Sequence, residues 1–587
     1  MTAYVFDIEA NGLNPTQIWC IVAIDTASGK VYSYGPDKIA EGVKLLSSAS
    51  KLIGHNILGY DIPVIKKLCG VDLQREDCKI VDTLVLSRLF NPTREGGHGL
   101  ESWGYRLHHH KLEFKEFEEY SQEMLDYCIR DVSLNHKVYN HLKIESKGFS
   151  PKSVQLEHKV YDILNAQRDR GFLLDVRHAT VLVAELEEKL LAAEQEVHKT
   201  FMPKDASIVL LPNYTKAGKL SKMAKQEGSE KKIRLSDEEF EKMSANPAPM
   251  VRADDIPFNL GSRKQIGEYL IEFGWKPVNF TPTGQPIVDE KTLSKIDNIP
   301  EAKLIAEYLM LQKRIAQINS WLKECDTDDE RVRGYVNTNG AVTGRMTHSS
   351  PNMAQIPSTN SPYGAECRRC WTVKDKHKLV GIDASGLELR MLAHYMDDEA
   401  YTYELLNGDI HTSNQNLAGL ESRSQAKTFI YALLYGAGDA KLGSVVGGNA
   451  RHGKTLRERF FDNLPAFKSL KDRVGRAAKR GWLKGLDGRK LFVRSEHAAL
   501  NTLLQGAGAI VMKEALVVFN DLLVAENIDP CFVANVHDEW QLEAPEHLAD
   551  RIGILGVQAI RQAGINLNLR CELDGEYNVG NNWAETH

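Results

Sequence analysis

The pattern of apolar, polar and proline residues changes three times along the 587 residues of this sequence. These changes indicate that the chain folds into several domains. Single hydrophobic cores stop growing at about 250 to 300 residues, so the length alone predicts two to four domains. The first 145 residues alternate short apolar runs, such as YVFDIEA and KIVDTLVLSRLF, with helical stretches. That alternation is typical of an α/β domain.

The middle of the chain reads as mostly helical, with one segment of different character. From Pro151 to about Thr200 the apolar spacing predicts amphipathic helix, and helical spacing returns at SRKQIGEYLIEFG and AKLIAEYLMLQKRIAQINSWL. Residues 203–257 between them are rich in proline and lysine, which indicates an insertion rather than core. After Arg333 the sequence mixes strand and helix patterns.

Composition excludes several classes of protein. Because there is no apolar run of about 18 residues and no basic-then-apolar leader, we expect neither a membrane span nor a secretory signal. The nine cysteines lie scattered and make no disulfide framework, and Cys367-x-x-Cys370 lacks a second pair at zinc spacing. A net charge of −6 argues against wrapping nucleic acid through bulk positive charge, so any DNA contact must come from local basic patches.

Acidic residues in three separated N-terminal segments predict a two-metal hydrolytic site. Asp7 and Glu9 are two apart in a predicted strand, which places both on one face. Asp61 lies beside an apolar segment, and Tyr127-x-x-x-Asp131 puts a phenol and a carboxylate one helical turn apart. Two Mg²⁺ held by such carboxylates activate a water and stabilise a leaving 3′-oxygen. Singly, each acid reads better as a surface charge or helix cap, but the combination favours the metal site.

A second pair of carboxylates lies in the C-terminal half. KLVGID predicts a buried strand that ends at Asp383, and CFVANVHDEWQLEAP predicts two short strands joined around Asp538. An acid in the turn of an apolar hairpin is costly unless it is hydrated or bound to a cation. Asp383 and Asp538 together can hold two Mg²⁺ for transfer to a primer 3′-hydroxyl. The alternative interpretation of the second segment is an ordinary hairpin turn.

Between these acids, ESRSQAKTFIYALLYGAGD predicts a helix with a row of side chains every four residues. The row consists of Arg423, Lys427, Tyr431 and Tyr435. Two cations followed by two aromatic rings fit a nucleotide, because cations neutralise the β and γ phosphates and the rings meet the sugar and base. A solvated basic helix face is the alternative, but it leaves the two tyrosines unexplained.

These motifs resemble those of two known groups of enzymes. DIE, GHN…YD and Y-x-x-x-D match in order the motifs of DEDDy proofreading nucleases. R-x-x-x-K-x-x-x-Y-x-x-x-Y-G, DASGLELR and VHDE match the O-helix motif and motifs A and C of family A DNA polymerases, and the resemblance is greatest to those of short-tailed bacteriophages. It implies a DNA-directed DNA polymerase for phage DNA replication that carries its own 3′→5′ exonuclease.

The resemblance also assigns roles to individual residues. It implies Asp7, Glu9, Asp61 and Asp131 as ligands of two Mg²⁺, Tyr127 as the residue that positions water, and Asp383, Ala384 and Asp538 as ligands of two further Mg²⁺. The residues implied in dNTP binding are Arg423, Lys427, Tyr431, Tyr435, His411 and Glu388. Those implied to face the primer-template duplex are Arg345, Asn501, Gln505 and His537.

Two of these residues imply substrate selectivity. In the family, the glutamate that matches Glu388 lies against the sugar and blocks a 2′-hydroxyl, which makes single-subunit RNA polymerases a poor fit. Tyr431 occupies a position where members carry Tyr or Phe. Because a tyrosine hydroxyl can substitute for the missing 3′-hydroxyl interaction, we expect the enzyme to accept dideoxynucleotides readily.

The fold class that follows is α/β and α+β multidomain, with an RNase H-like exonuclease domain and a right-hand polymerase. We expect the exonuclease at 1–145, a thumb with its insertion at 146–330, the first part of the palm at 331–400, fingers at 401–480 and the second part of the palm at 481–587. No room is expected for a 5′ nuclease domain before Asp7.

The expected partners are primer-template DNA, dNTPs and a phage helicase-primase, and the chain is expected to be a monomer in the cytoplasm of the infected bacterial host. Phage relatives that recruit host thioredoxin carry a long basic loop in the thumb. Residues 203–257 lie in the corresponding place but look shorter and different. Two interpretations of this segment therefore stay open: it binds thioredoxin, or its own lysines contact the DNA backbone directly.

Two rival functions also stay open at this point. One is a gap-filling or lesion-bypass polymerase with a decayed exonuclease, and the other is a nuclease or nucleic-acid-binding protein whose polymerase half is a scaffold. The complete N-terminal acid set argues against the first. The presence of Asp383, Asp538, Arg423 and Lys427 argues against the second.

Overall fold

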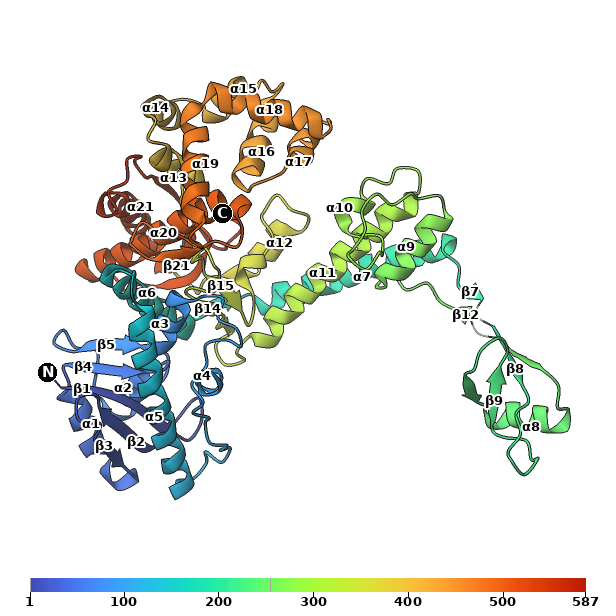
Figure 1. Ribbon diagram of the computed structural model, residues 1–587, viewed down its shortest axis with the longest axis horizontal. Helices are drawn as coiled ribbons and strands as arrows, with labels where there is room; N and C mark the ends of the chain where they lie inside the picture. The colour runs from blue at the N-terminus through green and yellow to red at the C-terminus, as the bar shows by residue number, and fades with distance from the viewer. Residues whose placement is uncertain (1, 206, 254) are drawn as a thin grey trace. The chain divides into compact units, whose positions relative to one another are not determined.

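The computed structural model describes residues 2–205, 207–253 and 255–587. The chain divides into two compact units (Figure 1). One unit is made of the residues up to 176 together with those from 324 onward, and the other is made of residues 177–323. In the sequence, the second unit therefore lies between the two segments that make up the first.

The N-terminal region is a mixed sheet covered by helices on both faces. Its strands are β1 (Ala3–Ala10), β2 (Ile18–Asp25), β3 (Val31–Tyr34), β4 (Lys51–Gly54) and β5 (Lys79–Asp82), in the order β3-β2-β1-β4-β5. Its helices are η1 (Pro36–Lys38), α1 (Ile39–Ser47), α2 (Asp61–Cys69), α3 (Thr83–Phe90), α4 (Leu100–Arg106) and α5 (Gln122–Glu145). β1 pairs antiparallel with β2 and parallel with β4, which places it in the middle of the sheet.

Burial on both faces explains the nearly continuous apolar run of β1. Phe6 and Ile8 pack into the core that includes residues of α1 and α2, whereas Val5 packs into the core on the α5 side. Asp7 and Glu9 therefore share the α5 face with Val5, because successive side chains of a strand alternate. The carboxylates are placed by the same periodicity that builds the core.

α6 (Pro151–Arg170) connects the N-terminal region to the C-terminal half of the same unit. The Ser150 hydroxyl caps its first turn by accepting from the Ser153 N–H, and the helix ends at Gly171, whose φ of +70° suits glycine. The helical stretch predicted from Pro151 to about Thr200 is therefore interrupted, and β6 (Phe172–Leu174) follows.

Buried ion pairs fasten α6 to the C-terminal half. The Glu157 carboxylate accepts hydrogen bonds from Arg489 and from Lys513, each at 2.5 Å, and Arg489 also pairs with Asp487. The side chains of these four residues are at most 2% exposed. Because a buried charge is tolerated only when it is paired, these ion pairs fix the position of α6 against the C-terminal half.

The C-terminal half is centred on an antiparallel sheet with the order β20-β21-β17-β22. Its strands are β17 (His377–Ala384), β20 (Phe532–Val536), β21 (Glu539–Pro545) and β22 (Gly575–Gly580), with α20 (Ala499–Ala525) and α21 (Ala549–Asn566) packed nearby. Short strands complete this half: β13 (Arg331–Val332), β14 (Tyr335–Asn337), β15 (Thr347–Ser349), β16 (Trp371–Thr372), β18 (Trp482–Lys484) and β19 (Lys490–Phe492).

Helices occupy the chain between β17 and β18. They are α13 (Leu387–Met396), α14 (Glu399–Asn407), α15 (Ile410–Ala418), α16 (Arg423–Leu434), α17 (Asp439–Ser444), α18 (Ala450–Asn463) and α19 (Pro465–Ala478), shown in gold to orange in Figure 1. α12 (Gly364–Arg369), η2 (Met353–Gln355), η3 (Glu496–Ala498) and η4 (Glu546–Leu548) are short helical turns. Apolar side chains of these helices and of the sheet share one continuous core.

The second unit has two cores of its own. α7 (Val176–Thr200), α9 (Arg263–Glu272), α10 (Glu290–Leu293) and α11 (Pro300–Glu324) surround the first. The predicted insertion forms β7 (Lys204–Asp205), β8 (Ile208–Leu211), β9 (Met223–Gln226), β10 (Lys232–Arg234), β11 (Met250–Arg252), β12 (Asp255–Ile256) and α8 (Asp237–Ala245), and residues 206 and 254 of it lie outside the described residues. A sheet ordered β10-β9-β8-β11 packs on α8 around Leu210, Ala224, Leu235 and Met243.

Within the described residues, no helix is both long and apolar enough to cross a bilayer. None of the nine cysteines, all of which lie among the described residues, forms a disulfide, and seven of them, including Cys20 and Cys128, are buried.

Candidate active sites

The structure brings together the four N-terminal acids Asp7, Glu9, Asp61 and Asp131, here called the N-terminal carboxylate cluster. Asp7 and Glu9 come from β1, Asp61 is the first residue of α2, and Asp131 lies on α5. Asp61 is 2% exposed, and its Oδ1 accepts a hydrogen bond of 3.0 Å from the Ile8 N–H, which ties α2 to β1. Asp131 is 3% exposed.

Burial and mutual repulsion disfavour the charged forms of these acids. Burial, and then the neighbouring acids Asp61, Glu9 and Asp131, raise the pKa of Asp7 well above its usual range. Burial is also the main cause that raises the pKa of Glu9 to about 9 and that of Asp61 to about 7. Asp131 Oδ1 is buried without a hydrogen-bond partner among the described residues. Hard oxygen ligands with unmet charge are what Mg²⁺ takes, so the residues present fit that ion.

Sequence reasoning missed Lys111 at this cluster. Its ammonium lies 2.6 Å from Asp131 Oδ2 and 4.9 Å from the centre of the Tyr127 ring. Lys111 belongs to the irregular segment between α4 and α5, where no periodicity signals a position. The nearby acids, Asp131 first among them, raise the pKa of Lys111 despite its burial.

Cys128 was also missed. Its thiol donates to the backbone oxygen of Asp7 at 3.7 Å, and burial raises the pKa of the thiol well above its usual range. The ligand atoms of Asp7, Glu9 and Cys128 all lie within 4.8 Å of one another. A signal was available, because Cys128 is three residues before Asp131 and so shares its face of α5.

A cavity of about 720 Å³ borders Tyr127, and its lining combines aromatic rings and two lysines with the acids Glu101 and Glu113. Its lining includes Lys111, Lys115, Tyr105, His110 and Phe114. The Phe114 and Tyr127 rings are 5.6 Å apart, and the Tyr105 and His110 rings 4.9 Å. Aromatic faces combined with cations suit single-stranded nucleic acid, whose bases stack while its phosphates pair with the cations.

The second pair of acids, Asp383 and Asp538, is here called the C-terminal carboxylate pair. Asp383 lies near the end of β17, and Asp538 lies in the turn between β20 and β21, where Val536 pairs with Glu539. The backbone N–H of Ala384 donates to the Asp538 backbone oxygen at 3.1 Å, which joins the strand end to the turn. Burial, followed by Glu539 and Asp538, raises the pKa of Asp383 to about 7.

The structure distinguishes Asp538 from the adjacent Glu539, which the sequence motif alone does not. Glu539 is held by hydrogen bonds from the Trp583 indole at 2.5 Å and with the His587 imidazole at 2.8 Å. Asp538 instead lines a small cavity together with Arg345 and His537. Glu539 therefore has a structural anchor, while Asp538 faces a space where a ligand can lie.

Glu388 links Arg345 to Tyr435 beside this pair. Tyr435 Oη donates to both Glu388 carboxylate oxygens, at 2.9 and 3.1 Å, and Arg345 Nη2 lies 3.3 Å from Oε1. These side chains come from the loop after β14, from α13 and from the C-terminal end of α16. Burial and Glu388 raise the pKa of Tyr435 to about 12, which keeps its phenol a donor.

α16 carries the predicted row of Arg423, Lys427 and Tyr431, and Tyr435 is its C-cap residue. Arg423 Nε pairs with Asp409 Oδ2 at 2.7 Å. The Tyr431 ring lies 6.4 Å from the Tyr435 ring and 6.4 Å from the ring of His411 on α15. The structure thus gathers His411 with the row, and Lys427 is exposed on it.

Asn501 and Gln505 lie one turn apart on α20 and are half-buried. Ala509, one turn further on the same helix face, lines the cavity of Arg345, His537 and Asp538. Because residues four apart share one face of a helix, Asn501 and Gln505 lie on the same face of α20 that borders the cavity of Asp538.

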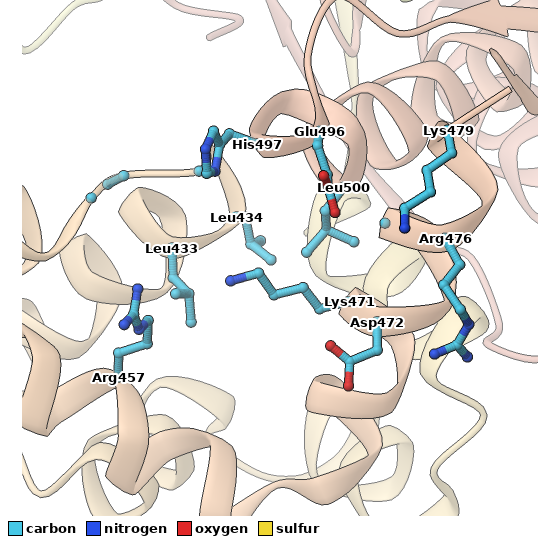
Figure 2. A pocket seen from close by; sticks show the side chains of 14 residues that line it. Leu433, Leu434, Arg457, Lys471, Asp472, Arg476, Lys479, Glu496, His497 and Leu500 are labelled. Carbon is cyan, nitrogen blue, oxygen red and sulfur yellow. The ribbon is translucent and has the colours of Figure 1, made fainter. Parts of the chain in front are cut away.

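A further cavity of about 460 Å³ lies at the C-terminal end of α16, and no sequence motif pointed to it. Figure 2 shows Lys471 extending into it, with Arg457, Arg476 and Lys479 among the other cations of the lining. Gly436, at φ +76°, passes so close to η3 that a Cβ would lie 2.6 Å from the His497 carbonyl oxygen, which accounts for glycine after Tyr435.

Comparisons with known proteins identify the family of the chain. A family model described as DNA polymerase family A matches residues 229–585. The DNA-directed DNA polymerases of Enterobacteria phage T3 and Escherichia phage T7 are each 35% identical to this chain, over 99% of it and 100% of the relative. A solved structure, the POL domain of Pol1 from M. smegmatis in complex with DNA primer-template and dNTP, superposes on this chain with a TM-score of 0.76 at 17% sequence identity. The match covers 99% of this chain and 96% of that one. It confirms the α/β and α+β multidomain fold class. The chain belongs to DNA polymerase family A.

Proposed function

We propose that this family A polymerase adds deoxynucleotides to a primer 3′-hydroxyl at the C-terminal carboxylate pair and removes mispaired 3′ ends at the N-terminal carboxylate cluster, during phage DNA replication. The observation that carries the proposal is the presence, in one chain, of two separate groups of acids, one of them largely buried and the other at a strand end and a hairpin turn. In each group, burial and the neighbouring acids raise the pKa of an aspartate, Asp7 in the first and Asp383 in the second.

At the polymerase site, Asp383, Asp538 and Ala384 would hold Mg²⁺. Bound there, Mg²⁺ lowers the pKa of the primer hydroxyl and neutralises the triphosphate. Arg423 and Lys427 on one face of α16 pair with the phosphates, and His411 lies against the same face. Since α15 and α16 carry all three groups, they orient the triphosphate toward the acids.

The sugar and the duplex are held by neighbouring groups. Glu388, fixed by Arg345 and Tyr435, fills the space that a 2′-hydroxyl would need, and the Tyr431 ring lies 6.4 Å from the Tyr435 ring. Asn501, Gln505, Arg345 and His537 contact the minor groove of the primer-template duplex. Acceptors in that groove are shared by all base pairs, so such contacts test pairing without reading sequence.

At the exonuclease site, Asp7, Glu9, Asp61 and Asp131 would hold two Mg²⁺, which supply an activated water and stabilise the leaving 3′-oxygen. Tyr127 orients the attacking water by its phenol. Lys111 holds the Asp131 carboxylate in place and adds positive charge where the phosphate arrives. The frayed primer end lies as a single strand along the Tyr105 and Phe114 rings of the adjoining cavity.

A 5′-labelled primer-template incubated with Mg²⁺, with and without the four dNTPs, tests this proposal. Asp538→Ala should abolish extension and keep shortening, whereas Asp7→Ala with Glu9→Ala should do the reverse. Extension alone by the wild type would indicate a gap-filling or bypass polymerase with a decayed exonuclease, and shortening alone a nuclease. If either variant lost both activities while circular dichroism showed a folded chain, the assignment of two sites would be wrong.

Residues 203–257 are proposed to slow dissociation from DNA through contacts to its backbone. Lys225 and Lys232 are exposed and directly opposite each other on β9 and β10, a like-charge pair that an anion would stabilise. Processivity should therefore fall steeply with salt in the wild type and less so in Lys225→Ala/Lys232→Ala. Added thioredoxin, the other candidate partner, would lengthen the products only if it binds this segment.

A further inference from the structure

We propose that Arg88, on α3 of the N-terminal region, is a positioning residue for the polymerase site. It fixes the loop of residues 338–344 and thereby Arg345, which holds Glu388 in place beside the C-terminal carboxylate pair. Arg88 thus contributes to the selection of deoxyribose over ribose, although it lies outside the half of the chain that carries the reaction. The consequence for sugar selection rests on the proposed function of Glu388, whereas the anchoring of the loop does not.

The first contact joins Arg88 to β14. The Arg88 guanidinium donates from Nη1 to the Tyr335 hydroxyl at 2.8 Å, and its Cζ atom lies 5.8 Å from the centre of the Tyr335 ring. Tyr335 is the first residue of β14, and both side chains are half-buried, so the hydrogen bond is partly shielded from water. Because a hydrogen bond from a charged donor is stronger than one between neutral groups, it fixes the start of β14 against α3 (Figure 1).

The second contact arises from the way α3 ends. The last carbonyls of a helix have no partner within it, and the N–H that would reach the Arg88 carbonyl oxygen belongs to position 92, which is proline. The Asn339 amide supplies the missing donor, with Nδ2 at 2.9 Å from this oxygen. Asn339 is 4% exposed, so breaking the bond would leave a buried polar group unpaired. Asn339 is therefore held to α3 of the N-terminal region.

Close packing carries the position of Asn339 to Arg345. Residues 341–345 form a tight turn, closed by a backbone hydrogen bond of 2.8 Å from the Gly344 N–H. Gly344 has φ +76°, and a Cβ there would lie 3.2 Å from Asn339 Oδ1, so the turn packs directly on this side chain. Arg345 is the next residue, and its Nη2 lies 3.3 Å from Glu388 Oε1. A shift of Asn339 therefore moves the group that holds Glu388.

Arg88 takes no part in the chemistry proposed for the N-terminal carboxylate cluster. Lys111 is the cation that pairs with this cluster, at 2.6 Å from Asp131 Oδ2. Replacing Arg88 should therefore leave primer shortening unchanged while it alters selection at the other site. The N-terminal region would thus also set the accuracy of the polymerase site, through packing rather than through a shared substrate.

Single-nucleotide extension by the full-length protein measures sugar selection as the ratio of kcat/KM for a dNTP to that for the matching rNTP. In Arg88→Met, which keeps the apolar stem, this ratio should fall about tenfold, because a small displacement of Arg345 frees Glu388. Tyr335→Phe removes the same hydrogen bond from its other end and should lower the ratio to a similar extent.

Two controls separate positioning from a general loss of structure. Arg75→Met should keep the wild-type ratio, because Arg75 is also half-buried but its hydrogen bonds reach Ala49 and Asp77 within the N-terminal region. Shortening of a single-stranded primer should be the same in Arg88→Met as in the wild type, which shows that the variant is folded.

Glu388→Ala tests the route of the effect. In that background Arg88→Met should not lower the ratio further, because its effect runs through Glu388. An unchanged ratio in both Arg88→Met and Tyr335→Phe, or an equal further fall in the Glu388→Ala background, would overturn the proposal.

If Glu388→Ala by itself left the ratio unchanged, the sugar-selecting role of Glu388 would be refuted instead. The anchoring of the loop is then decided by kcat/KM for the dNTP alone, which Arg88→Met should lower in the wild type but not in Arg345→Met. Equal losses in these two backgrounds would overturn the anchoring as well.

Discussion

The two carboxylate sites of this chain are built in different ways. In the N-terminal carboxylate cluster, the acids project from the faces of a strand and two helices that pack against each other, so Asp61 and Asp131 are almost fully buried. In the C-terminal carboxylate pair, Asp383 and Asp538 lie at a strand end and a hairpin turn. Their surroundings come from separate helices and loops. Core packing thus positions the first site, whereas the second depends on α15 and α16 being brought to it.

The largest expected effect tests the dependence of the second site on α16. Lys427→Met removes a charge that pairs with the triphosphate but keeps most of the apolar stem. We expect kcat/KM for extension to fall about 1000-fold, corresponding to about 4 kcal/mol of lost transition-state stabilisation. Single-turnover extension measures it. Shortening of a single-stranded primer by the same variant serves as the control, and a parallel loss there would contradict the separation of the sites.

Tyr431→Phe removes a single oxygen atom beside the C-terminal carboxylate pair and tests the role of that hydroxyl in nucleotide selection. The wild type should incorporate dideoxynucleotides readily, because the phenol replaces the missing 3′-hydroxyl interaction. The variant should discriminate against them about 100-fold, the value of one strong hydrogen bond. The measurement is the ratio of kcat/KM for the two nucleotides. Strong discrimination already present in the wild type would refute the role given to Tyr431.

Tyr127→Phe removes the corresponding hydroxyl at the N-terminal carboxylate cluster. Loss of the phenol that orients water should slow shortening by roughly 30-fold, because one hydrogen bond in the reacting complex is lost. Extension should be unchanged. Phe keeps the ring contacts with Phe114 and Phe117, so a fall in melting temperature of several degrees would indicate a structural role instead.

The smallest expected effect concerns stability, and it follows from the burial of the first site. Folding raises the pKa of Glu9 to about 9 and that of Asp61 to about 7, so the folded state binds more protons than the unfolded chain. Stability from these groups is therefore fully present at low pH and is lost as pH rises from about 4 through about 9. In EDTA, the melting temperature should fall by a few degrees between pH 5.5 and pH 8.5.

Two comparisons isolate this contribution. Mg²⁺ should reduce the fall, because a ligand of the native state stabilises it. Glu9→Gln, which cannot ionise, should also reduce it. If the wild type and Glu9→Gln lost stability equally with pH in EDTA, the carboxylate cluster would not be its source.

Much of both sites followed from local spacing in the sequence. The alternation of β1 predicted that Asp7 and Glu9 share a face, and the apolar run around VHDE predicted the hairpin of β20 and β21. The four-residue spacing of Arg423, Lys427 and Tyr431 predicted one side of a helix. Such inferences succeed because strand and helix periods depend only on neighbouring residues. The functional roles given to these residues stay predictions.

What the sequence by itself determined is therefore the family, the class of fold and the local geometry of each motif. Tertiary structure alone decided that Lys111 pairs with Asp131, that Cys128 faces Asp7 and Glu9, and that Glu539 is anchored while Asp538 faces a cavity. It also decided that the helical stretch after Pro151 breaks at Gly171 to add β6 between β13 and β16. The physical reason is that each of these depends on contact between segments distant in the chain, which packing selects and no local period records.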